Sequence, residues 1–265
     1  MVKAKKKPNP RPPRPDFWVG TKPIAIAHRG GDGAGKNKKN TLEAFESAWK
    51  QGIKYAEADV IRAASGELVV VHGSHNWIHA GISRGVTSRV LEMMTLDQIN
   101  YLTKPSGDRV MLLEELLSLF PKMKFVLDVK TDQAVEPLAK TLKRLKATER
   151  VCLSGYSYNR TLNFVEACRP AATNAGLTVG RGIRFRNMNM FMLKSGRLKG
   201  VEAIFMHHSL VSRPMVSLIH HRGFKAVVWT ANSGLGIKHA IRCGADGVIS
   251  DRVDLLKKIV SKSTK

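Results

Sequence analysis

The stretch YAEADVIRAASGELVVVHG, residues 55–73, constrains the fold more than any other part of the sequence. Its first half is typical of a strand, in which Glu57 and Asp59, two positions apart, point to the same face. The apolar run ELVVVH follows too closely for a crossover helix, so we expect it to return antiparallel in a hairpin that turns near residues 65–66. Such a hairpin brings His72 back beside Glu57.

Short apolar runs alternate with helical patterns along the rest of the chain. The first run, PIAIAH, is followed by NTLEAFESAWKQG, in which Asn40 is the predicted N-cap and Glu43 lies three residues later. This alternation indicates an α/β fold with a parallel sheet and covering helices. The predicted parallel strands, whose number of eight is that of a closed TIM (β/α)8 barrel, are 24–28, 55–61, 124–129, 151–156, 174–180, 201–206, 224–230 and 246–250.

The length of 265 residues suits a single barrel domain, which typically needs about 250 residues. Residues 1–20 are basic and rich in proline, and we expect a disordered arm there, followed by one domain over 21–262. Residues 73–123 contain two short helical patterns, MTLDQINYL and LLEELLSLF, which predict a small insertion over the barrel mouth after the second strand.

The formal net charge of +23 is the strongest signal in the composition. Such a field attracts nucleic acid, anionic membranes and phosphate-bearing small molecules alike. Aromatic residues do not interleave with the basic ones as a stacking platform for single strands requires. We therefore expect at most weak adsorption to anionic membranes or nucleic acid through a solvated basic surface, and no specific protein partner is indicated.

Cysteine use and the distribution of apolar residues favour a soluble cytoplasmic protein. No apolar run approaches the roughly 20 residues that cross a bilayer, and the basic start of the chain lacks the apolar segment of a secretory signal. The three cysteines, Cys152, Cys168 and Cys243, are odd in number and form no CxxC pair. This pattern argues against a disulfide framework and against a zinc site.

Three acidic residues on two predicted strands could bind a metal ion. Asp128 and Lys130 share a face near the end of the apolar strand FVLDVK, as Glu57 and Asp59 do on theirs. Active sites of barrel enzymes are built at such strand ends. Three carboxylates without clustered cysteines favour one hard divalent cation, Mg²⁺ or Ca²⁺. The alternative is that the acids form structural pairs with neighbouring lysine or arginine residues.

A histidine and two glycines end the first predicted strand. In the stretch HRGG, the glycines allow backbone N–H groups to approach an anion, and Arg29 could hold a phosphate through two hydrogen bonds. His28 could act as a general acid or base together with His72, since histidine titrates near neutral pH. The remaining histidines form no comparable group, and we expect them to be structural.

Several segments, in this order along the chain, resemble the successive motifs of the glycerophosphodiester phosphodiesterase family: IAHRGG, NTLEAFESAWKQG, AEADV, GELVVVHG, FVLDVK, VVWTAN and GADGVISD. The resemblance implies a TIM barrel that hydrolyses glycerophosphodiesters to glycerol 3-phosphate and an alcohol, with two histidines and one divalent metal. It assigns acid/base catalysis to His28 and His72, metal ligation to Glu57, Asp59 and Asp128, and substrate contacts to Arg29, Lys130, Trp229 and Asn232.

The chain departs from the family pattern at three places. Asp128 stands where the family usually has glutamate, Gly73 where it has aspartate, and KKNT, residues 38–41, where it has PENT. Aspartate remains a competent ligand, although it is shorter by one methylene group. The change at Gly73 removes an acid that could have hydrogen-bonded to a histidine.

Two other functions remain open. The segments EADV, HG and DVKT also resemble the sphingomyelinase D and phospholipase D branch of the same superfamily, which expels the head-group alcohol from lipids and can leave a cyclic phosphate. In a lysophospholipase of that kind, apolar insertion residues such as Trp77 and Ile78 would contact the membrane. The segments HRGG and NTLEAF favour the glycerophosphodiesterase side. The third possibility is a non-catalytic anion-binding barrel whose acids are structural.

Overall fold

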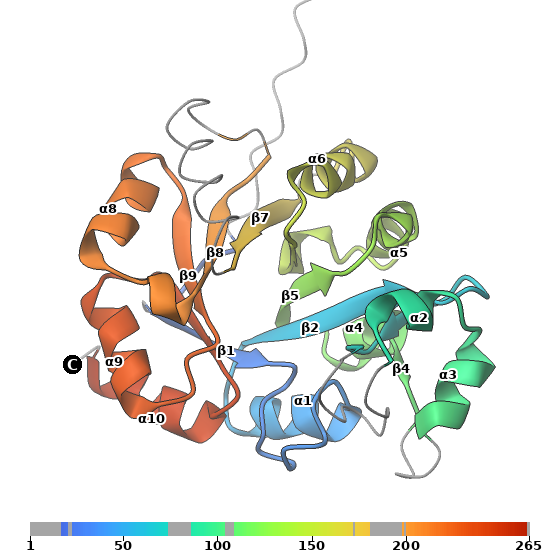
Figure 1. The fold of residues 1–265 in the computed structure, drawn as a ribbon, viewed down its shortest axis with the longest axis horizontal. Coiled ribbons are helices and arrows are strands. Elements are labelled where there is room, and N and C mark those ends of the chain that lie inside the picture. Colours follow the sequence, from blue (N-terminus) through green and yellow to red (C-terminus); the bar gives the residue numbers. More distant parts are fainter. Residues whose placement is uncertain are drawn as a thin grey trace, which may run out of the picture.

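Parallel strands form a closed barrel in the computed structural model (Figure 1). The model describes residues 17–20, 23–73, 86–103, 109–171, 173–180, 198 and 200–263. Within these ranges the eight barrel strands are β1 (Ile24–His28), β2 (Tyr55–Arg62), β5 (Lys124–Val129), β6 (Val151–Ser154), β7 (Asn174–Val179), β8 (Ala203–His207), β9 (Lys225–Trp229) and β10 (Gly247–Ser250). Because β1 pairs with both β10 and β2, the sheet closes on itself. The predicted TIM barrel is confirmed.

Helices surround the barrel strands (Figure 1). In α5 (Val135–Arg144) the buried residues 135, 138, 139 and 142 follow the helical period. The other helices are α1 (Leu42–Lys50), α2 (Ser88–Glu92), α3 (Leu96–Thr103), α4 (Leu113–Leu119), α6 (Tyr158–Ala167), α8 (Arg213–His221), α9 (Gly234–Arg242) and α10 (Val253–Ser263). Across the described residues, no helix combines the length and apolarity needed to span a membrane.

The hairpin predicted after the second strand is present. β3 (Leu68–Val70) runs antiparallel to the end of β2, with Val60 opposite Val70. The turn contains Gly66 with a φ of 112°, a conformation that glycine adopts at little cost. A two-residue strand, β4 (Met111–Leu112), pairs with the far side of β3.

The predicted insertion over residues 73–123 is only partly correct. Leu91 of α2 and Ile99 of α3 pack on the hairpin, so these helices do belong to an added unit. The buried leucines of α4, in contrast, join the core cluster that contains Phe45 and Phe125. Since α4 leads directly into β5, it is the crossover helix of the barrel and not part of a cover over its mouth. Trp77 and Ile78 lie outside the described residues.

The predicted disordered arm is wrong at its last residues. Phe17 is fully buried and packs edge-on against Trp18 and Tyr55, at ring-centroid distances of 4.8 and 5.5 Å. Its carbonyl oxygen accepts hydrogen bonds from the Tyr55 hydroxyl (2.6 Å) and from Nζ of Lys124 (2.8 Å). Tyr55 and Lys124 begin β2 and β5, so Phe17 and Trp18 close the amino-terminal end of the barrel interior. Residues 1–16 lie outside the described ranges.

Phe17→Ala should lower the free energy of unfolding by about 3–5 kcal/mol, because it empties a buried aromatic site. Urea denaturation of the full chain measures this value. Val19→Ala is the matched control: Val19 is 47% exposed, and its truncation should change stability by no more than about 0.5 kcal/mol. Equal stability of the two variants would show that the Phe17 side chain contributes nothing to the stability of the barrel.

Candidate active site

Strand register brings the predicted catalytic and metal-binding residues together. His28 on β1 lies beside Glu57 on β2, and Asp59 on β2 lies beside Asp128 on β5. In-register neighbours on parallel strands point to the same side of the sheet, so each pair shares a face. His28 ends β1 and Asp128 is next to last in β5, so the register sets Glu57 and Asp59 level with the carboxyl ends of the neighbouring strands, where barrel active sites form.

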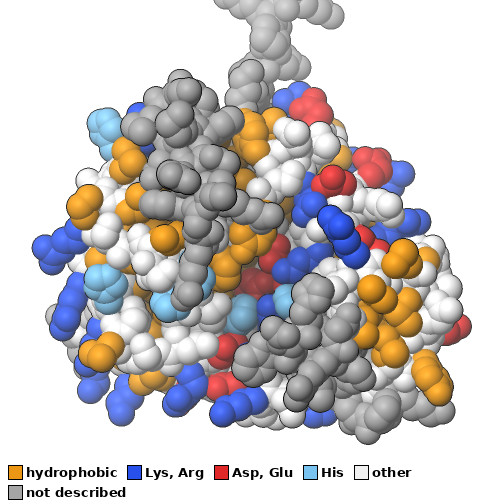
Figure 2. All heavy atoms as spheres, in the orientation of Figure 1, with side chains coloured by type: hydrophobic (Ala, Val, Ile, Leu, Met, Phe, Trp, Pro, Cys, Tyr) orange, Lys and Arg blue, Asp and Glu red, His pale blue; other side chains and the backbone are white. Residues whose placement is uncertain are grey.

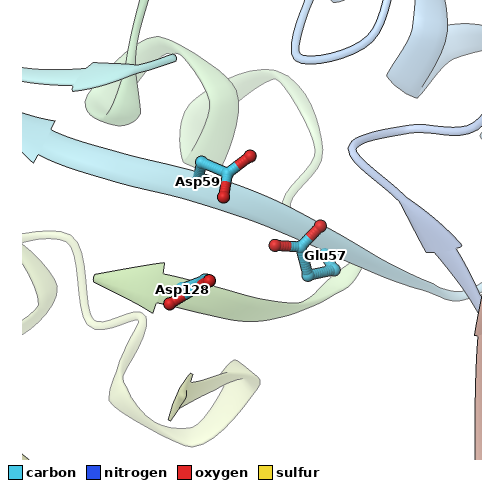
Figure 3. A group of neighbouring side chains, drawn as sticks. All are labelled: Glu57, Asp59 and Asp128. Atoms are coloured by element: carbon cyan, nitrogen blue, oxygen red, sulfur yellow. The ribbon is translucent and has the colours of Figure 1, made fainter. Parts of the chain in front are cut away.

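The three acids form one compact cluster at this end of the barrel. Glu57, Asp59 and Asp128 each offer a carboxylate oxygen, and these oxygens lie within 4.8 Å of one another. Figure 3 shows the three side chains on the neighbouring strands β2 and β5. Glu57 and Asp59 are buried, and Asp128 is partly exposed. The structure therefore assembles the predicted ligand set.

Two cations lie against these acids. Nε of Arg29 is 2.7 Å from Oδ2 of Asp59, and Nζ of Lys130 is 2.6 Å from Oδ1 of Asp59 and 2.5 Å from Oδ2 of Asp128. Although burial alone would raise the pKa of Asp59, Arg29 and Lys130 hold it well below its ordinary value. The structural pairing considered from the sequence thus exists, with Lys130 as the shared partner.

The cluster fits a divalent cation. Burial and the neighbouring charge of Asp59 raise the pKa of Glu57 well above its ordinary value, although the charges of Arg29 and Lys130 act in the opposite direction. Ca²⁺ takes oxygen ligands at about 2.3–2.6 Å, which allows two ligands of one ion to lie as far apart as these oxygens do, whereas Mg²⁺, at about 2.0–2.1 Å, requires them to move closer together. Three oxygen donors and no sulfur donor match the preference of such hard ions.

Both predicted catalytic histidines line one cavity of about 190 Å³ together with Glu57 and Asp128. Nε2 of His28 lies 3.8 Å from Oε2 of Glu57. The hairpin positions His72. The N–H of Val71 donates a hydrogen bond to the Asp59 carbonyl, so the pairing with β2 continues up to the residue that precedes His72. The prediction that His72 returns beside Glu57 is confirmed by their common cavity.

The opposite wall of the cavity is largely apolar. Trp229 lies there as predicted, with its ring edge-on to Tyr156 at 6.3 Å. Figure 2 shows the acidic, basic and histidine side chains next to apolar ones near the centre of this face. Sequence reasoning missed several lining residues within the last three positions of predicted strands, and that position was the only signal: Ser154, Tyr156, Thr178, Phe205 and Ile249.

Asn232, a predicted substrate contact, does not line this cavity. Its Nδ2 donates to Oδ2 of Asp251 (2.6 Å), and its Oδ1 accepts from the backbone N–H of Asp251 (2.8 Å). Arg29 and Lys130, in contrast, both line the cavity as predicted. Asn232 therefore lies outside the cavity lining, where it is exposed and holds the Asp251 side chain in place.

Asn40 is a residue of the site that sequence reasoning assigned wrongly. Helix α1 begins at Leu42 after Thr41, so Asn40 is not its N-cap. Asn40 is 2% exposed, and its Nδ2 donates to Oδ2 of Asp59 at 3.0 Å. Its backbone has a φ of 64° and donates to the Arg29 carbonyl at 2.8 Å. The side chain thus positions Asp59 instead of capping the helix.

Gly73 is required by close packing. A Cβ atom at this position would lie 2.2 Å from the backbone nitrogen of Ser88 and 2.3 Å from the carbonyl carbon of Thr87. No side chain fits there without moving the start of α2. The close packing of the start of α2 on the end of the hairpin therefore excludes an aspartate at the position after His72.

Comparison with known proteins gives consistent matches along most of the chain. Residues 28–255 match the model of the Glycerophosphoryl diester phosphodiesterase family. The glycerophosphodiester phosphodiesterase of Caldanaerobacter subterraneus is 26% identical over 91% of this chain and 99% of its own length. Lysophospholipase D GDPD3 of Mus musculus is 21% identical over 91% of this chain and 83% of its own length.

Solved structures share the fold. The glycerophosphodiester phosphodiesterase of Thermotoga maritima matches with a TM-score of 0.70 and 22% identity, over 89% of this chain and 97% of its own. An Oleispira antarctica phosphodiesterase, solved in complex with the product sn-glycerol-3-phosphate, matches with a TM-score of 0.72 and 20% identity, over 90% and 97% of the two chains.

Asn40→Gly should lower the free energy of unfolding by about 1–3 kcal/mol, because the buried Asp59 carboxylate loses a hydrogen bond while the positive φ is kept. Chemical denaturation measures the loss. Lys146→Gly is the control: Lys146 is exposed and has a φ of 51°, so the same relief of backbone strain occurs without a lost bond. If both variants are as stable as the parent chain, Asn40 does not support Asp59.

Proposed function

Because the chain belongs to the glycerophosphoryl diester phosphodiesterase family, we propose that it hydrolyses glycerophosphodiesters to glycerol 3-phosphate and an alcohol. The resemblance expected from the motifs is confirmed by the family match over residues 28–255, and the chain is an enzyme of this kind. The observation that supports this reaction best is the single cavity lined by His28, His72, Glu57 and Asp128.

A divalent cation is part of the proposal. Glu57, Asp59 and Asp128 would hold it, and Mg²⁺ and Ca²⁺ are the proposed ions since both prefer oxygen ligands. When bound, such a cation supplies a Lewis acid for a phosphate oxygen. Arg29 and Lys130 lie on the same cavity and place two further positive charges where negative charge builds up in the transition state.

The two histidines perform the proton transfers in this mechanism. One histidine takes the proton of the attacking hydroxyl, which belongs either to water or to the glycerol of the substrate, and the other donates a proton to the leaving alcohol oxygen. His28 and His72 come from β1 and from the end of the hairpin, and they line the same cavity. Burial and the charge of Arg29 lower the pKa of His28, which favours its neutral form at neutral pH.

Cleavage of lysophospholipids by the same site is the second candidate. Mouse and human relatives carry the name lysophospholipase D. The apolar wall of the cavity, with Tyr156, Phe205, Trp229 and Ile249, is the observation that favours it, because it offers contact area to the less polar part of a substrate. The third possibility, a non-catalytic anion-binding barrel, leaves the paired histidines without a role.

Two further proposals rest on the sequence alone. The net charge of +23 supports weak adsorption to anionic membranes or nucleic acid. The pattern of cysteines supports a location in the cytoplasm, and all three thiols, Cys152, Cys168 and Cys243, are free and buried.

The substrate assignment is tested by ³¹P NMR of reactions with glycerophosphocholine and, separately, with lysophosphatidylcholine, each with Mg²⁺, with Ca²⁺ and with chelator. We expect glycerol 3-phosphate from the first substrate, formed with metal and lost with chelator. Lysophosphatidic acid or a cyclic phosphate from the second substrate alone would assign the protein to the lipid-cleaving reaction instead. No product from either substrate would contradict both substrate assignments.

Replacing either histidine with alanine should lower kcat by about 10²–10⁴-fold, since each removes one proton transfer. The loss is measured with glycerophosphocholine in the presence of metal, after circular dichroism has shown that the variants fold. His221→Ala serves as the control, because His221 is exposed on α8 and does not line the cavity. Near-full turnover of the His28 or His72 variant would contradict the assignment of that residue.

A further inference from the structure

Asp251, at the junction of β10 and α10, connects several residues that the mechanism does not yet use. Its Oδ1 lies 2.7 Å from Nδ1 of His28 and 2.8 Å from Nζ of Lys39. Its Oδ2 accepts a hydrogen bond from Nδ2 of Asn232 at 2.6 Å. One carboxylate therefore joins a catalytic histidine to two residues outside the cavity wall.

The backbone of this residue is held as firmly as its side chain. The N–H of Asp251 donates to Oδ1 of Asn232 (2.8 Å), and its carbonyl accepts from the N–H of Asp32 (2.9 Å). Ser250 donates its hydroxyl to the same Oδ1 of Asn232 at 3.1 Å. With both backbone groups and both carboxylate oxygens engaged, Asp251 has little freedom to turn away from His28.

This contact determines how the imidazole ring presents itself to the cavity. An ionised carboxylate only accepts hydrogen bonds, so Nδ1 of His28 must carry the proton in the contact. When the ring is neutral, Nε2 then has the lone pair, and it is the nitrogen that faces Glu57 in the cavity. In this tautomer His28 is arranged to accept a proton at Nε2.

Lys39 belongs to the stretch KKNT, in which the chain departs from the family pattern, and it forms an ion pair with Asp251. Its side chain is 14% exposed, and its ammonium group shares Oδ1 of Asp251 with His28. Burial alone would raise the pKa of Asp251, but the hydrogen bond from His28 and the charge of Lys39 hold it well below its ordinary value. Lys39 thus stabilises the ionised carboxylate that orients the ring.

We propose that Lys39 and Asn232 are positioning residues that hold the Asp251 carboxylate against Nδ1 of His28, so that the proton of the neutral ring lies on Nδ1 and the ring turns Nε2 toward the cavity. The catalytic consequence rests on the proposed phosphodiesterase function. The orientation of the ring does not, and it can be measured without any substrate.

The first experiment is ¹⁵N NMR of the full chain with labelled histidine, which distinguishes a protonated from an unprotonated ring nitrogen. The signals of His28 among the nine histidines are identified by their loss in His28→Gln. We expect the proton on Nδ1 in the parent chain, and a mixture of tautomers in Asp251→Ala. A proton on Nε2 in the parent chain, or an unchanged tautomer in Asp251→Ala, would overturn the proposal.

The second experiment compares kinetics of Lys39→Met with those of Lys39→Arg and Lys50→Met. Lys39→Met should lower kcat by about 10- to 100-fold with little change in KM, as losses of residues that orient an active-site histidine do. Lys39→Arg should restore most of the loss because it keeps the charge. Lys50, the last residue of α1, is 76% exposed, and Lys50→Met should have the same kcat and KM as the parent chain.

The outcomes separate this proposal from the proposed function. Equal kcat for Lys39→Met and Lys50→Met would remove Lys39 from the positioning role. If no phosphodiester is cleaved at all, the tautomer experiment still decides whether Asp251 orients His28. A tautomer that depends on Asp251 would then support the positioning, whereas the failed turnover would count against the phosphodiesterase function.

Discussion

The burial of one carboxylate, that of Asp59, is the constraint on which the rest of the site depends. A charged group inside a barrel is costly unless ionic and hydrogen-bonding partners surround it. Arg29 and Asn40 provide these partners from the two ends of the connection between β1 and α1, and Lys130 provides one from the connection after β5. Arg29 and Asn40 both adopt positive φ, which costs of order 1–3 kcal/mol each outside glycine. Their hydrogen bonds and ion pairs with Asp59 offset this strain, and the same loops place Arg29 on the cavity and bring Lys39 to Asp251.

Strand register then places the other residues of the site around Asp59. The pairing of β2 with β5 sets Asp59 beside Asp128, and the pairing of β1 with β2 sets His28 beside Glu57. A shift of either pair by one residue would turn these side chains to the other face of the sheet. The buried apolar neighbours on β2, Ala58 and Val60, keep the register because they belong to the core between sheet and helices. In this part of the barrel, the register that buries the apolar side chains is therefore also the register that aligns the active-site side chains.

The sequence predicted those parts of the site that depend on short-range geometry. Glu57 and Asp59 share a face because strands have a period of two, and His72 returns because the short connection over residues 62–66 cannot hold a crossover helix. The eight strands follow from apolar runs between helical patterns, and all of them are present. The burial of Phe17 was not predicted, because the basic, proline-rich composition of residues 1–20 indicated disorder for the whole stretch. The roles of Asn40 and Asn232 could not be predicted either: both depend on partners 19 residues away that only the closed barrel brings near.

The net charge at the site is close to zero, whereas the molecule as a whole is strongly positive. Glu57, Asp59, Asp128 and Asp251 face the cations Arg29, Lys130 and Lys39, so the mouth of the barrel is close to balanced although the chain carries a net charge of +23. The excess positive charge therefore lies elsewhere on the molecule, where it raises the local concentration of anions without distinguishing among them. Discrimination must come from the cavity, where each cation is already held by an acid in a defined position. A phosphate group that fits between them gains charge-assisted hydrogen bonds from groups that need little reorganisation, and this is the property that electrostatic catalysis requires.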